Sequence, residues 1–482
     1  MNRALKNNKV LLINAPYVEG YGALKLAAGR YFPLGLGYIA AVLKQNGFDV
    51  RLVDPEAESL GFADLEKMIS NWKPLVVGVS SATPNFNNAM KIAKITKNVC
   101  HDSIVVIGGI HASALPEFVL LKSADVDVVV IGEGENTMLE LCNHAKDGKV
   151  SYGDIAGIAY RDGAHAKRTP SRSFITDIDT IPLPARELVN LKLFYPNLFN
   201  AKRRVSAGMI TSRGCPFKCY FCASHITMGA GYRSHSAKRV YDEIEMLVKK
   251  HGVELIIFLD DTFTFDKKRV REICELILKN RLRFEWNCLG RVSDVNEDLL
   301  RLMKKAGCYS IAYGVESGDE KTLSTMKKGI TIDQIRAAFS LSKKVGLRTQ
   351  AFFVFGNKGE TMEAIDRSIK LAKELNPLIA FFNILTPYPG TKAFEDMGII
   401  NNIESIDNWE DFVSIGPKAA FAGKLSKEEL TSSVYRANKE FYLRLSQLAR
   451  IGLSLRTFYE FSQYLKGGLA LIAQMAIWKK GR

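Results

Sequence analysis

The sequence predicts an α/β protein made of two consecutive units and a helical C-terminal region. In residues 1–150, short apolar strands alternate with helical segments, which is typical of a doubly wound sheet. A second series of alternating strands and helices begins at Val205. Three cysteines stand close together directly after the first strand of that series. These observations divide the chain into residues 1–150, a connector over 151–204, a second unit over 205–423 and a basic helical region over 424–482.

In the first unit we expect buried parallel strands that are bounded by Gly, Ser and Asp. They are predicted at 9–16, 49–53, 75–80, 104–107 and 127–131, with a helix at 34–46. In such sheets ligands bind beyond the carboxyl ends of the strands. Glycines at those ends let a bulky ligand approach the backbone.

The connector 151–204 contains a predicted hairpin near 158–163, because Asp162-Gly163 favours a tight turn. Residues 179–184 form an extended link interrupted by two prolines. No chemistry is assigned to the connector.

The second unit reads as an open parallel barrel, whose chemistry should lie at the carboxyl ends of its strands. Strands are expected at 205–212, 254–260, 284–291, 310–316, 348–356 and 378–386. Helices are expected near 236–251, 267–280, 296–306, 332–345 and 361–375.

Composition bounds the class of protein. A hydrophobic content of 47% and a charged content of 24% are ordinary for a globular protein. No secretory signal and no apolar run of about 18 residues is evident, so a cytoplasmic location is expected. The lone cysteines at 100, 142, 274, 288 and 308 are expected to be small buried hydrophobes in a reducing compartment.

The most informative stretch runs from Arg213 to Cys222 and contains Cys215, Cys219 and Cys222. Thiolates favour zinc, copper(I) or iron–sulfur clusters. A 4Fe–4S cluster usually takes four cysteines, so three would leave one iron open. A structural zinc site with His225 as fourth ligand is the alternative, although such sites usually pair two ligand hairpins.

The Cys-x3-Cys-x2-Cys spacing, with aromatic Phe221 before the last cysteine, resembles the signature of the radical S-adenosylmethionine (SAM) superfamily. The six-strand series resembles the partial (β/α)6 barrel of that superfamily. The resemblance implies a 4Fe–4S cluster on the three cysteines. It also implies that the amine and carboxylate of SAM chelate the open iron.

The first unit resembles the Rossmann-like cobalamin (B12)-binding domain of cobalamin-dependent radical SAM enzymes. The matching motifs are Pro33-Leu-Gly-Leu-Gly-Tyr38, Gly108-Gly109-x-His111 and Gly132-Glu-Gly-Glu135. The group in question includes the anaerobic magnesium-protoporphyrin monomethyl ester cyclase and hopanoid-modifying enzymes. One departure is the loop 15–22, which lacks the cobalt-binding histidine of many cobalamin domains. Either cobalt has no histidine lower ligand here, or cobalamin does not bind.

The positions that match these families give candidate site residues. Asp260 and Asp261 could accept hydrogen bonds from an ammonium or a ribose; the alternative is that Asp261 caps a helix. Arg291 could face a carboxylate, and Glu316 could accept from both ribose hydroxyls. The predicted SAM contacts are Phe221, Asp260, Asp261, Arg291, Glu316, Ser317 and Gly356. The predicted cobalamin contacts are Tyr17, Ser80, Ser81, Thr83, Gly108, Gly109, His111, Gly132, Glu133, Gly134 and Glu135.

The resemblance implies an oxygen-sensitive enzyme in which the reduced cluster splits SAM, and the resulting radical takes a hydrogen atom from an unactivated carbon. The usual outcome in relatives is transfer of a methyl group from cobalamin to that carbon of a small-molecule, lipid or isoprenoid substrate. A reducing donor such as flavodoxin or ferredoxin is implied. The alternatives are a radical cyclase, oxidoreductase or rearrangement enzyme with cobalamin as mediator, and a non-catalytic cobalamin-binding sensor.

The net charge is +15, and residues 424–482 carry 11 Lys and Arg against 4 Asp and Glu. Helices are expected at 427–446, 453–464 and 469–478, with a break at Lys466-Gly467-Gly468. The last piece, with Trp478 and flanking lysines, could lie at a membrane interface or dock on the barrel. Basic residues do not alternate with base-stacking aromatics, so no nucleic-acid partner is expected.

Overall fold

The computed structural model describes residues 7–17, 29–149, 151–197, 200, 202–203, 205–413 and 424–480. Its N-terminal unit is a seven-stranded sheet in the order β2-β1-β3-β4-β5-β6-β7. The five parallel strands are β1 (Lys9–Asn14), β2 (Asp49–Val53), β3 (Val76–Ser80), β4 (Ile104–Gly108) and β5 (Val128–Val130). Their apolar runs are buried on both faces, as expected for parallel strands between two helical layers.

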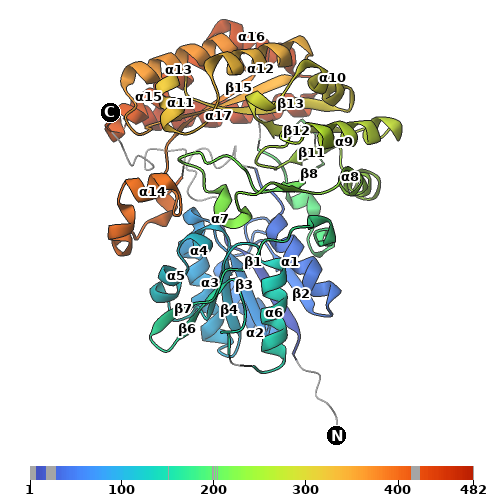
Figure 1. Ribbon diagram of the computed structural model, residues 1–482, viewed down its shortest axis with the longest axis vertical. Helices are drawn as coiled ribbons and strands as arrows, with labels where there is room; N and C mark the ends of the chain where they lie inside the picture. Colours follow the sequence, from blue (N-terminus) through green and yellow to red (C-terminus); the bar gives the residue numbers. More distant parts are fainter. Residues whose placement is uncertain are drawn as a thin grey trace.

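Helices cover both faces of this sheet (Figure 1). They are α1 (Leu34–Gln45), α2 (Phe62–Trp72), α3 (Phe86–Val99), α4 (Ile110–Ala114), α5 (Pro116–Lys122) and α6 (Glu135–Lys146). The strand order reverses at β1, which pairs with β2 on one side and β3 on the other. Such a reversal opens a crevice at the carboxyl ends of the strands.

The predicted hairpin is β6 (Ile158–Asp162) and β7 (His165–Arg168), and Gly163 has a φ of +60° in its turn. Both strands join the edge of the N-terminal sheet in antiparallel pairing. The sheet therefore continues past residue 150 into the segment that we had placed in the connector. Sequence could not indicate this, because edge pairing depends on contacts between distant residues.

The second unit is a six-stranded parallel sheet in the order β15-β14-β13-β12-β11-β8. Its strands are β8 (Ser206–Met209), β11 (Leu255–Phe258), β12 (Glu285–Gly290), β13 (Cys308–Glu316), β14 (Arg348–Phe355) and β15 (Ile379–Ile384). Its main helices are α8 (Ala237–His251), α9 (Lys267–Lys279), α10 (Glu297–Lys305), α11 (Glu320–Thr325), α12 (Ile332–Lys344) and α13 (Met362–Leu375). The predicted fold class is confirmed.

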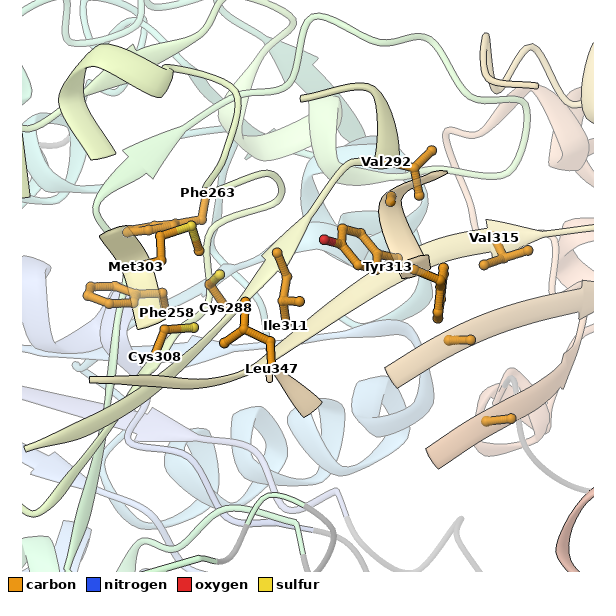
Figure 2. Packing of buried hydrophobic residues seen from close by; sticks show 14 of the residues in the cluster. Phe258, Phe263, Cys288, Val292, Met303, Cys308, Ile311, Tyr313, Val315 and Leu347 are labelled. Atoms are coloured by element: carbon orange, nitrogen blue, oxygen red, sulfur yellow. The ribbon is translucent and has the colours of Figure 1, made fainter. Parts of the chain in front are cut away.

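The interior of this unit is filled by apolar side chains (Figure 2). Cys288 and Cys308 lie there among Phe258, Ile311 and Leu347. Cys274 belongs to the same cluster, and all three thiols are free. These cysteines pack as small hydrophobes, as predicted.

A segment after β15 returns to the N-terminal unit, as seen beside α4 and α5 in Figure 1. It comprises α14 (Lys392–Asp396), η8 (Ile399–Ser405) and η9 (Trp409–Asp411). Phe394, Trp409 and Phe412 are buried in the core of the N-terminal unit. We did not predict this strap (residues 392–413), which ties the end of the barrel to the first unit.

The C-terminal region forms α15 (Lys427–Tyr442), α16 (Leu445–Ser454) and α17 (Phe458–Lys480). The predicted helix over 427–446 is wrong at its end, because it stops at Tyr442 and a new helix starts at Leu445. The predicted break at Gly467-Gly468 is also wrong, because α17 runs through both glycines. Packing of the helix against the barrel overrides the low helix propensity of glycine. The side chain of Trp478 lies outside the described part of the structure.

Candidate functional site

The cysteine loop begins at the carboxyl end of β8 and faces the N-terminal unit. A two-stranded ribbon, β9 (Ser212–Arg213) and β10 (Arg233–Ser234), closes its base. Gly214 has a φ of +80°, and an added Cβ would lie 2.2 Å from the carbonyl oxygen of Gly231. Only glycine fits this close crossing. The backbone N–H of Tyr220 donates to Met326 O at 2.9 Å, which anchors the loop to α11.

Cys215, Cys219 and Cys222 are half-buried free thiols. Burial, together with the neighbouring Cys219, Asp261 and Cys215, raises the pKa of Cys222 to about 11, although a backbone hydrogen bond from Ser224 opposes this. Burial likewise raises the pKa of Cys215. Over the described residues, no three His, Cys, Asp or Glu side chains converge on a position for one metal ion. An iron–sulfur cluster does not require the three cysteines to converge on one point, because each thiolate binds a separate iron. His225 is exposed at the start of α7 (Ser224–Met228).

Asp260 has a structural role that we did not anticipate. It is 1% exposed, and its carboxylate accepts from Thr211 N at 3.1 Å, Thr211 Oγ1 at 2.8 Å and Ser212 Oγ. Burial raises its pKa, which the cation of Arg269 and these hydrogen bonds oppose. Asp260 thus fixes the chain just before the cysteine loop, because these internal donors hold its carboxylate.

Asp261 and Arg291 do face the loop. Asp261 is exposed and accepts from Ser224 Oγ, and its charge acts on Cys215 and Cys222. The Arg291 guanidinium lies 3.7 Å from the centroid of the Phe217 ring within the loop. It also donates to the carbonyl oxygens of Lys328 and Gly329, at 3.0 Å for the latter.

Glu316 ends β13 with a φ of +64°, a conformation that is costly for a residue other than glycine and is common at functional sites. Its Oε1 accepts from Lys328 Nζ at 2.6 Å, and both side chains are largely buried. Burial lowers the pKa of Lys328, but Glu316 and Cys219 outweigh this effect and leave it raised. The Lys328 Nζ lies 6.0 Å from the Phe221 ring. Sequence reasoning missed Lys328; the signal was a lysine pair before Gly329, shortly after the Glu316 strand.

Ser317 and Gly356 are engaged within the protein. Ser317 Oγ lies 3.2 Å from Ser368 Oγ and accepts from Asp319 N at 3.2 Å. Gly356, with a φ of +89°, donates its N–H to Glu360 Oε2 at 2.7 Å. These contacts shape the loops after β13 and β14. The structure therefore gathers Phe221, Asp261, Arg291 and Glu316 around the cysteines, while Asp260, Ser317 and Gly356 support them.

A cavity of about 220 Å³ lies at the carboxyl ends of the N-terminal strands. Ser80, Gly108, Gly109 and the segment Gly132–Glu135 line it, as predicted for the cobalamin contacts. Further lining residues that we missed are Gly35, Tyr38, Gly78 and Met138 from the same unit and Ile210, Arg213, Thr227 and Met228 from the second unit. Gly35 and Tyr38 belong to the Pro33–Tyr38 motif, which was a signal for both.

Small residues keep this cavity open. An added Cβ on Gly78 would lie 2.9 Å from Leu12 Cδ2, and one on Gly134 would lie 2.8 Å from Ile39 Cδ1. The lining is mostly apolar, with a few polar groups at the strand ends. A mainly apolar recess bordered by glycines at a strand-order reversal suits part of a large organic cofactor.

Four predicted cobalamin contacts lie away from this cavity: Tyr17, Ser81, Thr83 and His111. His111 is 1% exposed and packs between Phe86 and Trp409, with ring centroids 4.3 and 4.7 Å away. Its Nδ1 lies 3.3 Å from Thr83 Oγ1. Thr83 and His111 do not line this cavity; they contact the strap, which gives His111 a structural role. The backbone of Ser81 packs against Gly109, and Tyr17 N donates to Glu56.

Comparison with known proteins agrees with this arrangement. A B12 binding domain matches residues 23–142, and the Radical SAM superfamily matches residues 209–372. A protein of Pyrococcus horikoshii named as an uncharacterized methyltransferase is 35% identical over 91% of this chain and 94% of its own length. The chain belongs to the cobalamin-binding radical SAM enzymes.

Two further relatives of these enzymes are informative. The anaerobic magnesium-protoporphyrin IX monomethyl ester cyclase of Rubrivivax gelatinosus is 34% identical over 81% of this chain and 70% of its own length. The radical SAM methyltransferase TsrM of Kitasatospora setae, solved with cobalamin and a 4Fe–4S cluster, has the same fold. Its TM-score is 0.71 at 17% identity, over 97% of this chain and 99% of TsrM.

Membership in the family confirms that the chain is an enzyme with cobalamin, a 4Fe–4S cluster and SAM as cofactors. The described residues fit these groups. Three thiols share one loop, and the glycine-bordered cavity opens at the predicted strand ends. No histidine is among the described residues that line the cavity.

Proposed function

We propose that this radical SAM enzyme transfers a methyl group to an unactivated carbon of a small-molecule, lipid or isoprenoid substrate. The observation that carries the proposal is the meeting of the cysteine loop with the cobalamin-type cavity. Ile210, Arg213, Thr227 and Met228, which flank the three cysteines, line that cavity together with the N-terminal strand ends. The two cofactors would thus act on one substrate between the units.

The proposed roles follow from the placement of the residues. Cys215, Cys219 and Cys222 would each bind one iron, and the metal would remove the thiol protons, although burial raises the pKa of Cys215 and Cys222. Arg291 and Lys328 lie against Phe217 and Phe221 of the loop, and they would attract the carboxylate of SAM. Glu316 and Asp261 would accept hydrogen bonds from its ammonium or ribose groups.

The cavity would hold cobalamin, and its lack of a described histidine suits cobalt without a histidine lower ligand. When bound, the cofactors supply a radical that removes hydrogen from carbon and a methyl group to replace it. A one-electron donor such as flavodoxin or ferredoxin would reduce the cluster. The protein's own part is to orient these groups and exclude water between the two units.

The products of SAM distinguish methyl transfer from cyclisation. Reduced, cobalamin-loaded enzyme would be incubated with SAM and an anaerobic cell extract as the source of substrate. Methyl transfer predicts S-adenosylhomocysteine together with 5′-deoxyadenosine. A product mixture with 5′-deoxyadenosine and no S-adenosylhomocysteine would favour a radical cyclase, as one relative is named. Cys219→Ala should form neither product beyond background. Cys142→Ala is the control and should form both products, because Cys142 lies in the core of the N-terminal unit and all three cluster cysteines are kept.

We further propose a peripheral contact between the C-terminal helices and an anionic membrane. Along α17, Phe458, Phe461, Leu465, Leu469 and Ile472 are 48–84% exposed. Their spacing places them on one face of the helix. The opposite face, with Glu460, Gln463 and Gln474, is buried on the barrel. On α16, Leu445, Leu448 and Leu453 extend this exposed apolar surface.

Charge favours an anionic partner for this surface. Arg456 and Lys466 are exposed beside it. Glu460 is the one acidic residue of α16 and α17, and it pairs with Arg348 at the start of β14. The contact would lie at the end of the barrel opposite the cysteine loop. It would therefore hold the enzyme at the surface rather than feed lipid directly into the site. Over the part of the chain that the structure describes, no helix is long and apolar enough to cross a bilayer.

Vesicle flotation tests the membrane contact. The enzyme should float with phosphatidylglycerol vesicles and less with phosphatidylcholine vesicles, and Leu465→Glu should weaken flotation. Leu121→Glu in α5 is the matched control, because Leu121 is also exposed, at 62%, but lies on the other unit. Equal flotation of both variants with the unchanged protein would refute the contact. Dimerisation that is lost in Leu465→Glu, without flotation, would assign the surface to a second copy instead.

A further inference from the structure

A buried network of charges joins the cavity of the N-terminal unit to the cysteine loop. Arg213 Nη1 donates to Glu133 Oε1 at 2.9 Å, and its Nη2 donates to Glu135 Oε1 at 2.6 Å. Arg233 Nη1 donates to the same Glu133 Oε1 at 2.8 Å. The four side chains are only 5–12% exposed.

Each of these four residues is also held by further contacts or by its place in a secondary-structure element. Arg213 and Arg233 face each other across the β9–β10 ribbon, and Arg213 stands two residues before Cys215. Arg233 also donates to the carbonyl oxygens of Ile175 and Met228, both at 2.7 Å. Glu133 Oε2 accepts from Ile175 N at 2.9 Å, and Glu135 is the first residue of α6. The Arg213 guanidinium also lies 5.2 Å from the Tyr38 ring centroid.

The same residues form part of the cavity wall. Gly132 to Glu135, Tyr38, Arg213 and Met228 all line it, whereas Arg233 does not. We had assigned Glu133 and Glu135 to cobalamin. Their Oε1 atoms also accept from the two arginines, so their carboxylates join the two units. A ligand that presses on this wall therefore presses on groups that also position the start of the cysteine loop.

Burial makes the network responsive to the loss of any member. Removing one partner of a buried ion pair leaves the other charge unpaired, and this is strongly unfavourable. The two arginines and two carboxylates stay paired only while the ribbon keeps its position against the start of α6.

We propose that Arg213, Arg233, Glu133 and Glu135 act as positioning residues that couple occupancy of the cavity to the geometry of the cysteine loop. The proposal rests on the proposed function, because it takes cobalamin as the cavity ligand. The coupling is reciprocal: the cluster changes cobalamin affinity by the same factor by which cobalamin changes cluster affinity.

The dissociation constant of hydroxocobalamin, read from its absorbance, tests the coupling. It would be measured with the cluster-reconstituted enzyme and with the cluster-free enzyme. The two constants should differ by about 5-fold or more, the lower end of typical coupling energies. In Arg233→Gln the ratio should fall towards one, although Arg233 touches neither the cavity nor a cysteine. Glu135→Gln is a second variant in case Arg233→Gln folds poorly.

Glu243→Gln is the matched control. Glu243 of α8 accepts from Arg186 Nη2 at 3.0 Å, and these side chains are 4% and 2% exposed. This pair is equally buried but lies outside the cavity wall and the cysteine loop. Glu243→Gln should keep the ratio of the unchanged enzyme. The electron paramagnetic resonance spectrum of the reduced cluster should shift on adding cobalamin to the unchanged enzyme and to Glu243→Gln, but not to Arg233→Gln.

A ratio of one in the unchanged enzyme, or the same ratio in Arg233→Gln as in Glu243→Gln, would overturn the coupling while leaving the proposed function intact. A chain that forms its cluster and binds no cobalamin would instead refute the proposed function together with the coupling.

Discussion

Asp260 and Asp261 are neighbours in sequence but lie in opposite environments. Asp260 is buried and accepts from Thr211 and Ser212, whereas Asp261 is exposed beside the cysteines. Both were predicted as SAM contacts, because two acids follow an apolar strand. The sequence could not indicate that they point apart, because the direction of a side chain after a strand end depends on the loop that follows. Lys328 was missed for the same reason, since its partner Glu316 lies on another element.

Gly214 gives the sharpest residue-level prediction. Gly214→Ala places a Cβ 2.2 Å from Gly231 O at a φ of +80°, so the cysteine loop must shift. The iron content after reconstitution should fall severalfold, while far-ultraviolet circular dichroism stays unchanged.

Gly231→Ala is the control for this change. An added Cβ on Gly231 meets no atom within 4 Å, and iron content should stay near that of the unchanged enzyme. Full iron loading of Gly214→Ala would contradict the close crossing.

His111 predicts a dependence of stability on pH. Burial lowers the pKa of its ring from 6.5 to about 3. In the unfolded chain this ring takes up its proton near pH 6.5, whereas in the folded chain it stays neutral to a lower pH. Above pH 6.5 His111 therefore does not reduce the free energy of unfolding. It should fall by a few kcal/mol, at about 1.4 kcal/mol per pH unit, as the pH drops from 6.5 towards 3. Urea unfolding at several pH values measures this slope.

His111→Phe should flatten the slope, because no proton is then taken up at this position on unfolding. An unchanged slope in His111→Phe would show that other groups cause the acid sensitivity.

At the scale of elements, most strands lie within a few residues of their predicted bounds, because their apolar runs are long and distinct. The errors fall where tertiary contacts decide. The strap over 392–413 has no strong period of its own and is ordered by Trp409 and Phe412 in the core of the N-terminal unit. The continuous helix α17 likewise depends on its docking, through Glu460, Gln463 and Gln474, rather than on local propensity.

The strap should hold the N-terminal unit against the barrel. Trp409 is fully buried and contacts Phe86, His111 and Phe118. Trp409→Ala should therefore lower the free energy of unfolding by about 3–5 kcal/mol, as for other buried aromatics. Limited proteolysis should then cut the strap faster.

Phe458→Ala is the control, because Phe458 is 84% exposed and its loss should leave unfolding and strap cleavage unchanged. Equal protease resistance of both variants would show that the strap does not depend on Trp409.

At the scale of the whole molecule, the sequence predicted two units and their cofactors, because both rest on short local motifs. It could not predict how the units meet. The Arg213–Glu135 and Arg233–Glu133 contacts join residues from different units and have no signal in spacing. The extension of the N-terminal sheet by β6 and β7 belongs to the same class of long-range contact.

Metal and cofactor counting after anaerobic purification with added hydroxocobalamin tests the account most directly. Three cysteines around one cluster predict about four irons and four sulfides per chain. The cavity between the units predicts one cobalt per chain. Cys219→Ala should lose the iron. A single zinc in place of iron, or a fully iron-loaded enzyme that retains no cobalt, would contradict the account.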